Sequence, residues 1–206
     1  MSEVALAAGT WCRCLVLQTS LLWASASAGA DIRQIDVHHE DERYFLSLEA
    51  FIDAPPLAVF AVVTDYENID RLHRRVRESR VLRRIDGRTV EVYTLMKGCV
   101  AGIFCKSLKR VERVEETPPG ELVATVLPEQ SDFASGSVRW RLDAEGAGTR
   151  LRYDSEMDPD FWVPAILGDG LLQMSIKRTT KDMIQQVEIE ARSLAIGGGE
   201  PWIERQ

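Results

Sequence analysis

The pair Cys99 and Cys105 is the first place where residue type and spacing suggest a specific chemistry. The two cysteines are six positions apart, which is compatible with a disulfide that closes the loop between two strands. Two buried free thiols are the alternative. A zinc site needs four ligands, and His38, His39 and His73 lie far away in the sequence, so no metal site is expected.

Catalytic groups are harder to find. General acid–base catalysis needs a titratable side chain within hydrogen-bond reach of the substrate. None of the three histidines falls on a predicted inward face, and the inward faces of the clearest strands offer only Tyr153 and Ser155 as polar groups. The sequence has no serine-nucleophile motif, phosphate-binding glycine loop or dinucleotide fingerprint. We therefore expect no catalytic residue and no cofactor, and a non-catalytic role is favoured over an enzymatic one.

Four aromatic side chains are candidates for contact with a ligand. Trp140 and Tyr153 combine a large ring with a polar tip, which can line a cavity and offer one hydrogen bond. Phe161 and Trp162 lie in a proline-bracketed loop at residues 158–164, just before a long helical pattern. This loop could be a lid over a ligand, an anchor on lipid headgroups or a hydrophobic plug on the core. For Trp140 and Tyr153, the alternative is that the rings simply pack in the core.

The first thirty residues are typical of a secretory signal peptide. Residues 15–23 form a mostly apolar run that is too short to span a bilayer, and small residues at 24–30 offer cleavage sites. Glu3 lies where positive charge is expected, so the true start could lie nearer Arg13. We expect a signal peptide at 1–30, a polar lead-in at 31–42, one domain at 43–195, a flexible tail at 196–206 and a periplasmic or secreted location.

Composition and charge limit the kinds of partner. The chain has 206 residues, 45% of them hydrophobic, and a formal net charge of −7. This length suits one large domain with a real core. Nucleic acid is not expected as a partner, because proteins that bind it usually carry a basic patch. The local exception is a group of arginines that we interpret as the solvated face of a strand and its lead-in, namely Arg74, Arg75, Arg77, Arg80, Arg83 and Arg84.

Alternation and turn signals predict the elements that would position these side chains. Period-two alternation and turn residues indicate seven strands, at 44–52, 76–85, 89–96, 103–115, 122–127, 137–143 and 149–157. Two short helices follow the first strand, at 57–64 and 68–73. A long helix at 164–194 carries apolar residues at steps of three and four. The element order is one strand, two short helices, six strands and one long helix.

This order, together with local sequence, resembles a known superfamily. The residues that carry the resemblance are Ala54-Pro55, Val59-Phe60, Thr64-Asp65-Tyr66-Glu67, Asp132-Phe133-Ala134-Ser135-Gly136 and Trp140-Arg141-Leu142. The chain is similar to the helix-grip superfamily of START lipid-transfer domains, birch-pollen allergens and polyketide cyclases, and within it to the coenzyme Q-binding branch. The resemblance implies an α+β fold in which a curved antiparallel sheet of about seven strands surrounds the long C-terminal helix.

A sheet curved around a helix leaves a largely apolar space where the inward side chains do not close it, and such spaces are the usual small-molecule sites. Every inward residue could instead fill a core. The ligand-contact candidates are Leu46, Leu48, Val92, Val138, Trp140, Tyr153 and Met157 on the sheet, Phe161 and Trp162 in the loop, and Leu172, Ile176 and Met183 on the helix.

The leading hypothesis is a monomeric, non-catalytic binder or carrier of a hydrophobic small molecule or lipid, such as a quinone or a polyketide-like ring system. If the aromatic loop is an anchor, a membrane surface is a further candidate partner, for transient contact. A polyketide cyclase-like enzyme is the second hypothesis, and it requires convergent polar side chains in the cavity. A protein-interaction module with a filled pocket is the third.

Overall fold

The computed structural model of the chain describes residues 29–100, 104–160 and 168–197. The elements, in chain order, are β1 (Asp31–Glu40), β2 (Arg43–Ile52), α1 (Pro56–Val63), α2 (Ile69–Leu72), β3 (Val76–Arg84), β4 (Thr89–Val100), β5 (Phe104–Thr117), β6 (Glu121–Val126), the 3-10 turn η1 (Pro128–Gln130), β7 (Phe133–Glu145), β8 (Gly148–Pro159) and α3 (Gly168–Gly197).

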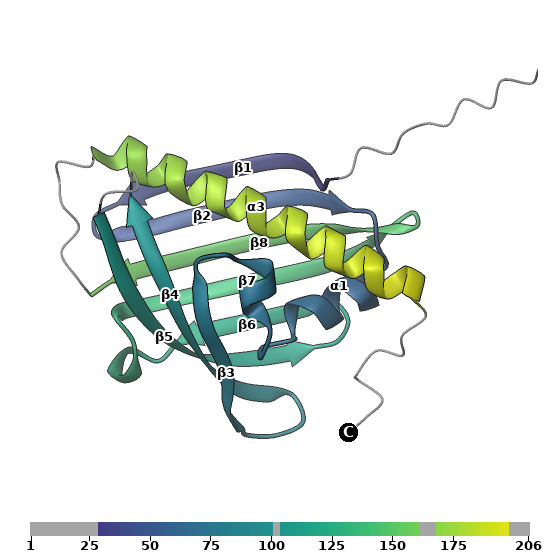
Figure 1. Ribbon diagram of the computed structural model, residues 1–206, viewed down its shortest axis with the longest axis horizontal. Coiled ribbons are helices and arrows are strands. Elements are labelled where there is room, and N and C mark those ends of the chain that lie inside the picture. Colours follow the sequence, from purple (N-terminus) through teal and green to yellow (C-terminus); the bar gives the residue numbers. More distant parts are fainter. Residues whose placement is uncertain (1–28, 101–103, 161–167, 198–206) are drawn as a thin grey trace, which may run out of the picture.

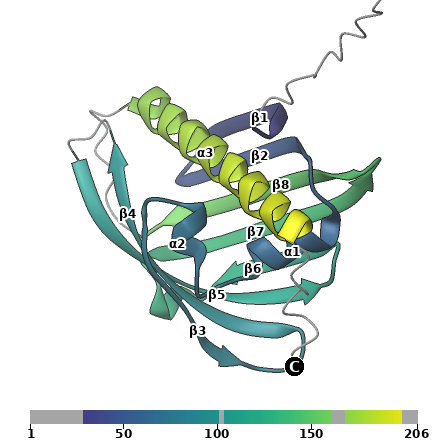
Figure 2. The same cartoon turned by 45° about the vertical axis from the view of Figure 1, so that its right-hand side comes forward.

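The strands form one antiparallel sheet in the order β1-β2-β8-β7-β6-β5-β4-β3. β2 crosses over to pair with β8, and every other neighbouring pair is consecutive in the chain. The sheet curves, and α3 lies across its concave face (Figures 1 and 2). This arrangement confirms the helix-grip fold expected from the sequence.

The number of strands differs from the expected seven. Residues 31–40, expected as a polar lead-in, form the edge strand β1, which pairs with β2. Val37 is buried and Ile35 packs against the core, but most other side chains of β1 are at least partly exposed. An edge strand that buries few side chains gives only a weak alternation signal, and a register irregularity between Ile32 and Gln34 interrupts it further.

The turns follow the chemistry that the sequence indicated. At the Asp86-Gly87 turn, Oδ1 of Asp86 accepts a hydrogen bond of 2.7 Å from the backbone N–H of Arg88, as aspartate commonly does in turns. Gly146, in the β7–β8 turn, has a φ of 60°, a conformation that glycine adopts without steric cost. These hairpins set the register of the strands that face α3.

The packed core lies at one end of α3. Ile184, Val187 and Ala191, in the C-terminal half of the helix, are completely buried, as are Val59 and Phe60 of α1. Figure 1 shows α1 beside this end of α3. Because valines are poor helix formers, the burial of α1 against α3 and the sheet stabilises that helix. In the N-terminal half of α3, the residues from 170 onward are half-buried or exposed, apart from Thr180, which is buried.

A buried polar pair ties the segment after α1 to β5. The Tyr66 hydroxyl donates a hydrogen bond of 2.8 Å to Oε1 of Glu116, and both residues are more than 90% buried. Burial raises the pKa of Glu116 above its ordinary value, and the hydrogen bond from Tyr66 acts in the opposite direction. The pKa of the Tyr66 hydroxyl is also raised, by burial first and then by Glu116.

Candidate ligand-binding cavity

A cavity of about 480 Å³ lies between the N-terminal half of α3 and the concave face of the sheet. Its volume falls in the range of known small-molecule sites. Side chains from β1, β2, β4, β5, β7, β8 and α3 line it, and most of the lining surface is apolar. Apolar members of the lining include Val37, Leu46, Met96, Leu108, Met157 and Ile176.

Five of the residues expected to contact a ligand line this cavity. They come from β2, β8 and α3, and they are Leu46, Tyr153, Met157, Leu172 and Ile176. The alternation of the strands and the three-to-four spacing of the helix therefore placed these five side chains on faces that line the cavity.

The other expected contact residues lie elsewhere. Leu48, Val92 and Val138 belong to the packed core, and Trp140 and Met183 pack against it. Trp140 meets Tyr153 edge to face across β7 and β8, with ring centroids 4.7 Å apart. These side chains share a sheet face or helix stripe with the cavity residues, but they lie in or against the packed core. Phe161 and Trp162 lie outside the described residues.

Basic side chains enter the cavity as well, which the sequence reading missed. Arg75, Lys106 and Arg110 are among the lining residues. The expectation that Arg75 lies on a solvated face is wrong, because its half-buried side chain lines the cavity. Its segment is the turn between α2 and β3, where period-two alternation does not determine the direction of a side chain. Arg110 shares its strand face with Lys106 and Leu108, but β5 carries charges on both faces, so alternation gave no signal.

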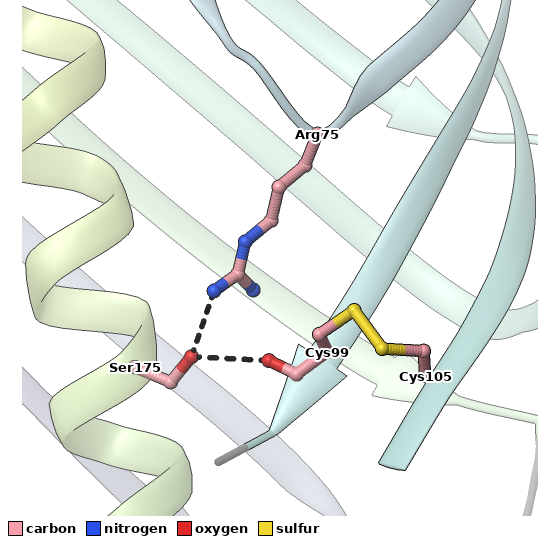
Figure 3. The surroundings of a disulfide bond; sticks show 4 residues. All are labelled: Arg75, Cys99, Cys105 and Ser175. Atoms are coloured by element: carbon pink, nitrogen blue, oxygen red, sulfur yellow. Dashed lines mark hydrogen bonds between the residues drawn. A yellow bond between two sulfur atoms is a disulfide. The ribbon is translucent and has the colours of Figure 1, made fainter. Parts of the chain in front are cut away.

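Arg75 spans the space between the start of β3 and α3. Its Nη2 donates a hydrogen bond of 3.2 Å to Oγ of Ser175, and the Ser175 hydroxyl lies 3.4 Å from the carbonyl oxygen of Cys99, to which it donates (Figure 3). Among the side chains that the structure describes, which leave out Asp169, no carboxylate forms an ion pair with the Arg75 guanidinium. The half-buried Arg75 guanidinium thus has the Ser175 hydroxyl as its one side-chain partner among those described.

His73 also lines the cavity, contrary to the expectation that no histidine points inward. Its Nδ1 accepts a hydrogen bond of 3.1 Å from the backbone N–H of Arg75. Burial, followed by the charge of Arg75, lowers the pKa of His73 to about 4. The ring is therefore neutral at pH 7, and an accepting Nδ1 places its proton on Nε2.

Arg110 of β5 and Tyr153 of β8 are further polar side chains in the lining of the cavity. Nε of Arg110 lies 3.0 Å from Oε2 of Glu112, but this buried nitrogen makes no hydrogen bond within the described structure. Burial raises the pKa of the Tyr153 hydroxyl, while the charge of Arg110 and a hydrogen bond with Ser155 act in the opposite direction. Tyr153 is therefore protonated at neutral pH, and its hydroxyl can both donate and accept a hydrogen bond.

Cys99 and Cys105 form a disulfide, as the sequence predicted. The two residues face each other at the ends of β4 and β5 and both line the cavity. The bond fixes the hairpin whose Cys99 carbonyl accepts from Ser175. Disulfides persist in oxidising compartments, and the bond fits an extracellular location.

Two further findings concern metals and membranes. Among the residues that the structure describes, no three histidine, cysteine, aspartate or glutamate side chains are grouped so as to hold a metal ion. No helix in the described ranges has both the length and the apolar character needed to cross a membrane.

A family model described as polyketide cyclase / dehydrase and lipid transport matches residues 46–191. No curated protein matches the chain in sequence. The match covers β2 through most of α3 and so includes most of the cavity. It confirms the superfamily that the sequence resembled, whereas the narrower resemblance to the coenzyme Q-binding branch stays a prediction.

Solved structures share the fold at low sequence identity. The Zhui aromatase/cyclase from Streptomyces sp. R1128 has a TM-score of 0.60 and 16% identity, covering 76% of this chain and 98% of that one. A START superfamily protein from Mycobacterium smegmatis has a TM-score of 0.56 and 18% identity, covering 70% and 97%. A STAR-related lipid transfer protein from Xanthomonas axonopodis has a TM-score of 0.54 and 14% identity, covering 74% and 98%.

Proposed function

We propose that this chain, which belongs to the polyketide cyclase / dehydrase and lipid transport family, binds a hydrophobic small molecule or lipid in the cavity under α3 without transforming it. The observation that carries the proposal is the cavity of about 480 Å³ with its mostly apolar lining. A packed interior, which the protein-interaction hypothesis requires, would leave no such space.

The chemistry of the polar lining favours binding over catalysis. A general base needs a free lone pair near the substrate, but Nδ1 of His73 already accepts from the Arg75 backbone and Nε2 carries the proton. The raised pKa of Tyr153 keeps its hydroxyl protonated. These groups are suited to hold and orient a ligand.

Titration with the neutral apolar dye Nile red tests this proposal. We expect saturable fluorescence enhancement with the wild-type protein. Thr179→Trp places a large ring in the cavity, since Thr179 lines it from α3, and should weaken dye binding by about tenfold or more, equivalent to at least about 1.4 kcal/mol.

Met174→Trp is the matched control, because Met174 lies on the same helix but is 60% exposed and is not part of the lining. It should bind the dye as the wild type does. Circular dichroism and thermal unfolding establish that both variants are folded. An absence of saturable binding to the wild type, or equal binding by the two tryptophan variants, would contradict the proposal.

A polyketide cyclase-like activity is the second candidate, and one observation favours it. His73, Arg110 and Tyr153 converge on one cavity, which is the kind of polar convergence that such an enzyme requires. Incubation with a linear poly-β-ketone thioester, followed by mass spectrometry and chromatography of the products, tests it. The candidate predicts faster cyclisation than in buffer, and a slower reaction with Tyr153→Phe. Equal rates with and without the protein would exclude it for that substrate.

Export is the cellular part of the proposal. The disulfide between Cys99 and Cys105 supports it. Expression of the full chain in a bacterial host, followed by fractionation and mass measurement, should find a periplasmic product cleaved near residues 24–30. A full-length cytoplasmic product with free thiols would contradict it.

A further inference from the structure

The charge of the cavity is opposite to that of the protein. The chain has a formal net charge of −7, yet the described residues that line the cavity include Arg75, Lys106 and Arg110 and no aspartate or glutamate. Burying a charge is costly unless it is paired. An apolar ligand alone would not explain why guanidinium groups face this space.

Arg75 is the more informative of the two arginines. Its side chain is held toward α3 by the hydroxyl of Ser175, 3.2 Å from Nη2, and Ser175 is itself anchored on the Cys99 carbonyl. Figure 3 shows the guanidinium between α3 and the β4–β5 hairpin. A serine hydroxyl positions the group without neutralising it, so its charge is available to a ligand.

Arg110 adds a second guanidinium across the cavity. It forms an ion pair with the buried Glu112, whose Oε2 lies 3.0 Å from Nε, while Nε itself donates no hydrogen bond in the described structure. The tyrosine and serine hydroxyls of Tyr153 and Ser155 line the same region. Guanidinium and hydroxyl groups together are donors that suit the oxygens of a carboxylate or a phosphate.

From this arrangement we infer that the ligand is amphipathic: its apolar body lies among Leu46, Met157 and Ile176, and its anionic carboxylate or phosphate group is bound by Arg75 and Arg110. This inference rests on the proposed function, and it adds the chemical class of the ligand. Arg75 supplies a charge that is paired with no described carboxylate, and Arg110 supplies a second donor from β5.

Competition against bound Nile red tests the inference with ligands that differ in one group. Dodecanoate and dodecanol have the same chain length, and only dodecanoate is charged at pH 8. We expect the wild type to bind dodecanoate at least about tenfold more tightly than dodecanol, because hydrogen bonds to a charged group are the stronger ones. Dodecyl phosphate should share this preference. Equal affinity for dodecanoate and dodecanol would overturn the inference, and this ratio needs no variant.

Arg75→Met removes the charge and keeps the length of the side chain. It should weaken dodecanoate binding by about tenfold and leave dodecanol binding within about twofold of the wild type. Arg77→Met is the matched control, because Arg77 lies two residues away, is exposed and is not part of the lining. It should change neither affinity. A loss of both ligands with Arg75→Met, at unchanged stability, would assign Arg75 a purely structural role and overturn the inference.

Acetate and inorganic phosphate separate an amphipathic ligand from a free anion. Neither should displace dodecanoate at concentrations at which dodecyl phosphate does. If inorganic phosphate competed as well as dodecyl phosphate, the site would bind a free anion and the inference would fail. If dodecanol and Nile red bound but charge made no difference, the inference would fail while the proposed function held. If no apolar ligand bound at all, both would fail.

Discussion

Arg75 and Ser175 meet across the cavity, with Nη2 of the arginine 3.2 Å from Oγ of the serine. The arginine comes from the turn before β3 and the serine from the first turns of α3 (Figure 3). This contact therefore joins the helix to the segment that leads into the sheet. The serine also donates to the Cys99 carbonyl. One hydroxyl thus connects the helix, the α2–β3 turn and the disulfide-bonded hairpin.

Ser175→Ala removes both hydrogen bonds of this hydroxyl. We expect a loss of about 0.5 to 1.5 kcal/mol in the free energy of unfolding, the usual range for a hydrogen bond in a protein, measured by urea denaturation. Ser107→Ala is a control at an exposed position of β5, and it should change stability by less than about 0.5 kcal/mol. If both variants were equally stable, the contact across the cavity would carry no energy.

His73 should make folding depend on pH. The pKa of His73 is about 4 in the folded protein, compared with the ordinary value of 6.5 for a solvated histidine in the unfolded chain. Between these two pH values the unfolded chain binds a proton that the folded chain does not. The free energy of unfolding therefore rises with pH across this window. The contribution is fully present above pH 6.5 and is lost as pH falls toward 4. It amounts to about 3 kcal/mol if the whole shift is expressed.

The variant that isolates this effect is His73→Asn, whose side-chain oxygen can accept the Arg75 backbone hydrogen bond without titrating. Urea denaturation at several pH values gives the stability difference between wild type and variant. We expect this difference to change in favour of the variant as pH falls from 7 to 4. Parallel stability curves would show that His73 titrates alike in the folded and unfolded chains.

The Tyr66–Glu116 pair should be sensitive to loss of its hydroxyl. Tyr66→Phe leaves a buried carboxylate without this donor, which should cost about 1 to 3 kcal/mol of stability. Tyr93→Phe is the control, because Tyr93 is half-buried and its contact with Arg80 is made by the ring, which phenylalanine keeps. Chemical denaturation gives the free energy of unfolding of both variants. An equal loss of stability in Tyr93→Phe and Tyr66→Phe would contradict the prediction.

The disulfide should add stability by restricting the unfolded chain. Closing so short a loop is worth about 2 kcal/mol in the chain-entropy description, so the double variant Cys99→Ser and Cys105→Ser should unfold at a lower urea concentration. Wild-type protein treated with a thiol reductant should behave in the same way. An unchanged unfolding midpoint in both experiments would show that the bond contributes nothing to the folded state.

Much of the fold could be predicted because turn chemistry, alternation and the helix stripe agree. Asp86-Gly87 and the glycines around Ala147 mark hairpins regardless of their surroundings, and the stripe from Leu172 to Leu194 is long. β1 was missed because an edge strand buries few side chains. Its one buried residue, Val37, is separated from the next strand by a run of charged and histidine residues.

The cavity could be predicted only in part. Alternation assigns a side chain to one face of the sheet, so it found Leu46 and Tyr153. It does not show where along that face the packed core ends and the cavity begins. Leu48 and Val138 lie on the core side of this limit. Arg75 projects from a turn, and its direction depends on the distant Ser175, which no local pattern encodes.

Methyl NMR tests most directly whether an apolar ligand occupies this cavity. With labelled isoleucine, leucine and methionine methyl groups, addition of dodecanol should shift the signals of Leu46, Met157 and Ile176, which line the cavity. The signal of Ile184, completely buried in the core, should change little. Shifts confined to exposed side chains such as Leu171 and Ile196, or no shifts at a saturating dodecanol concentration, would contradict the proposal that this cavity binds an apolar ligand.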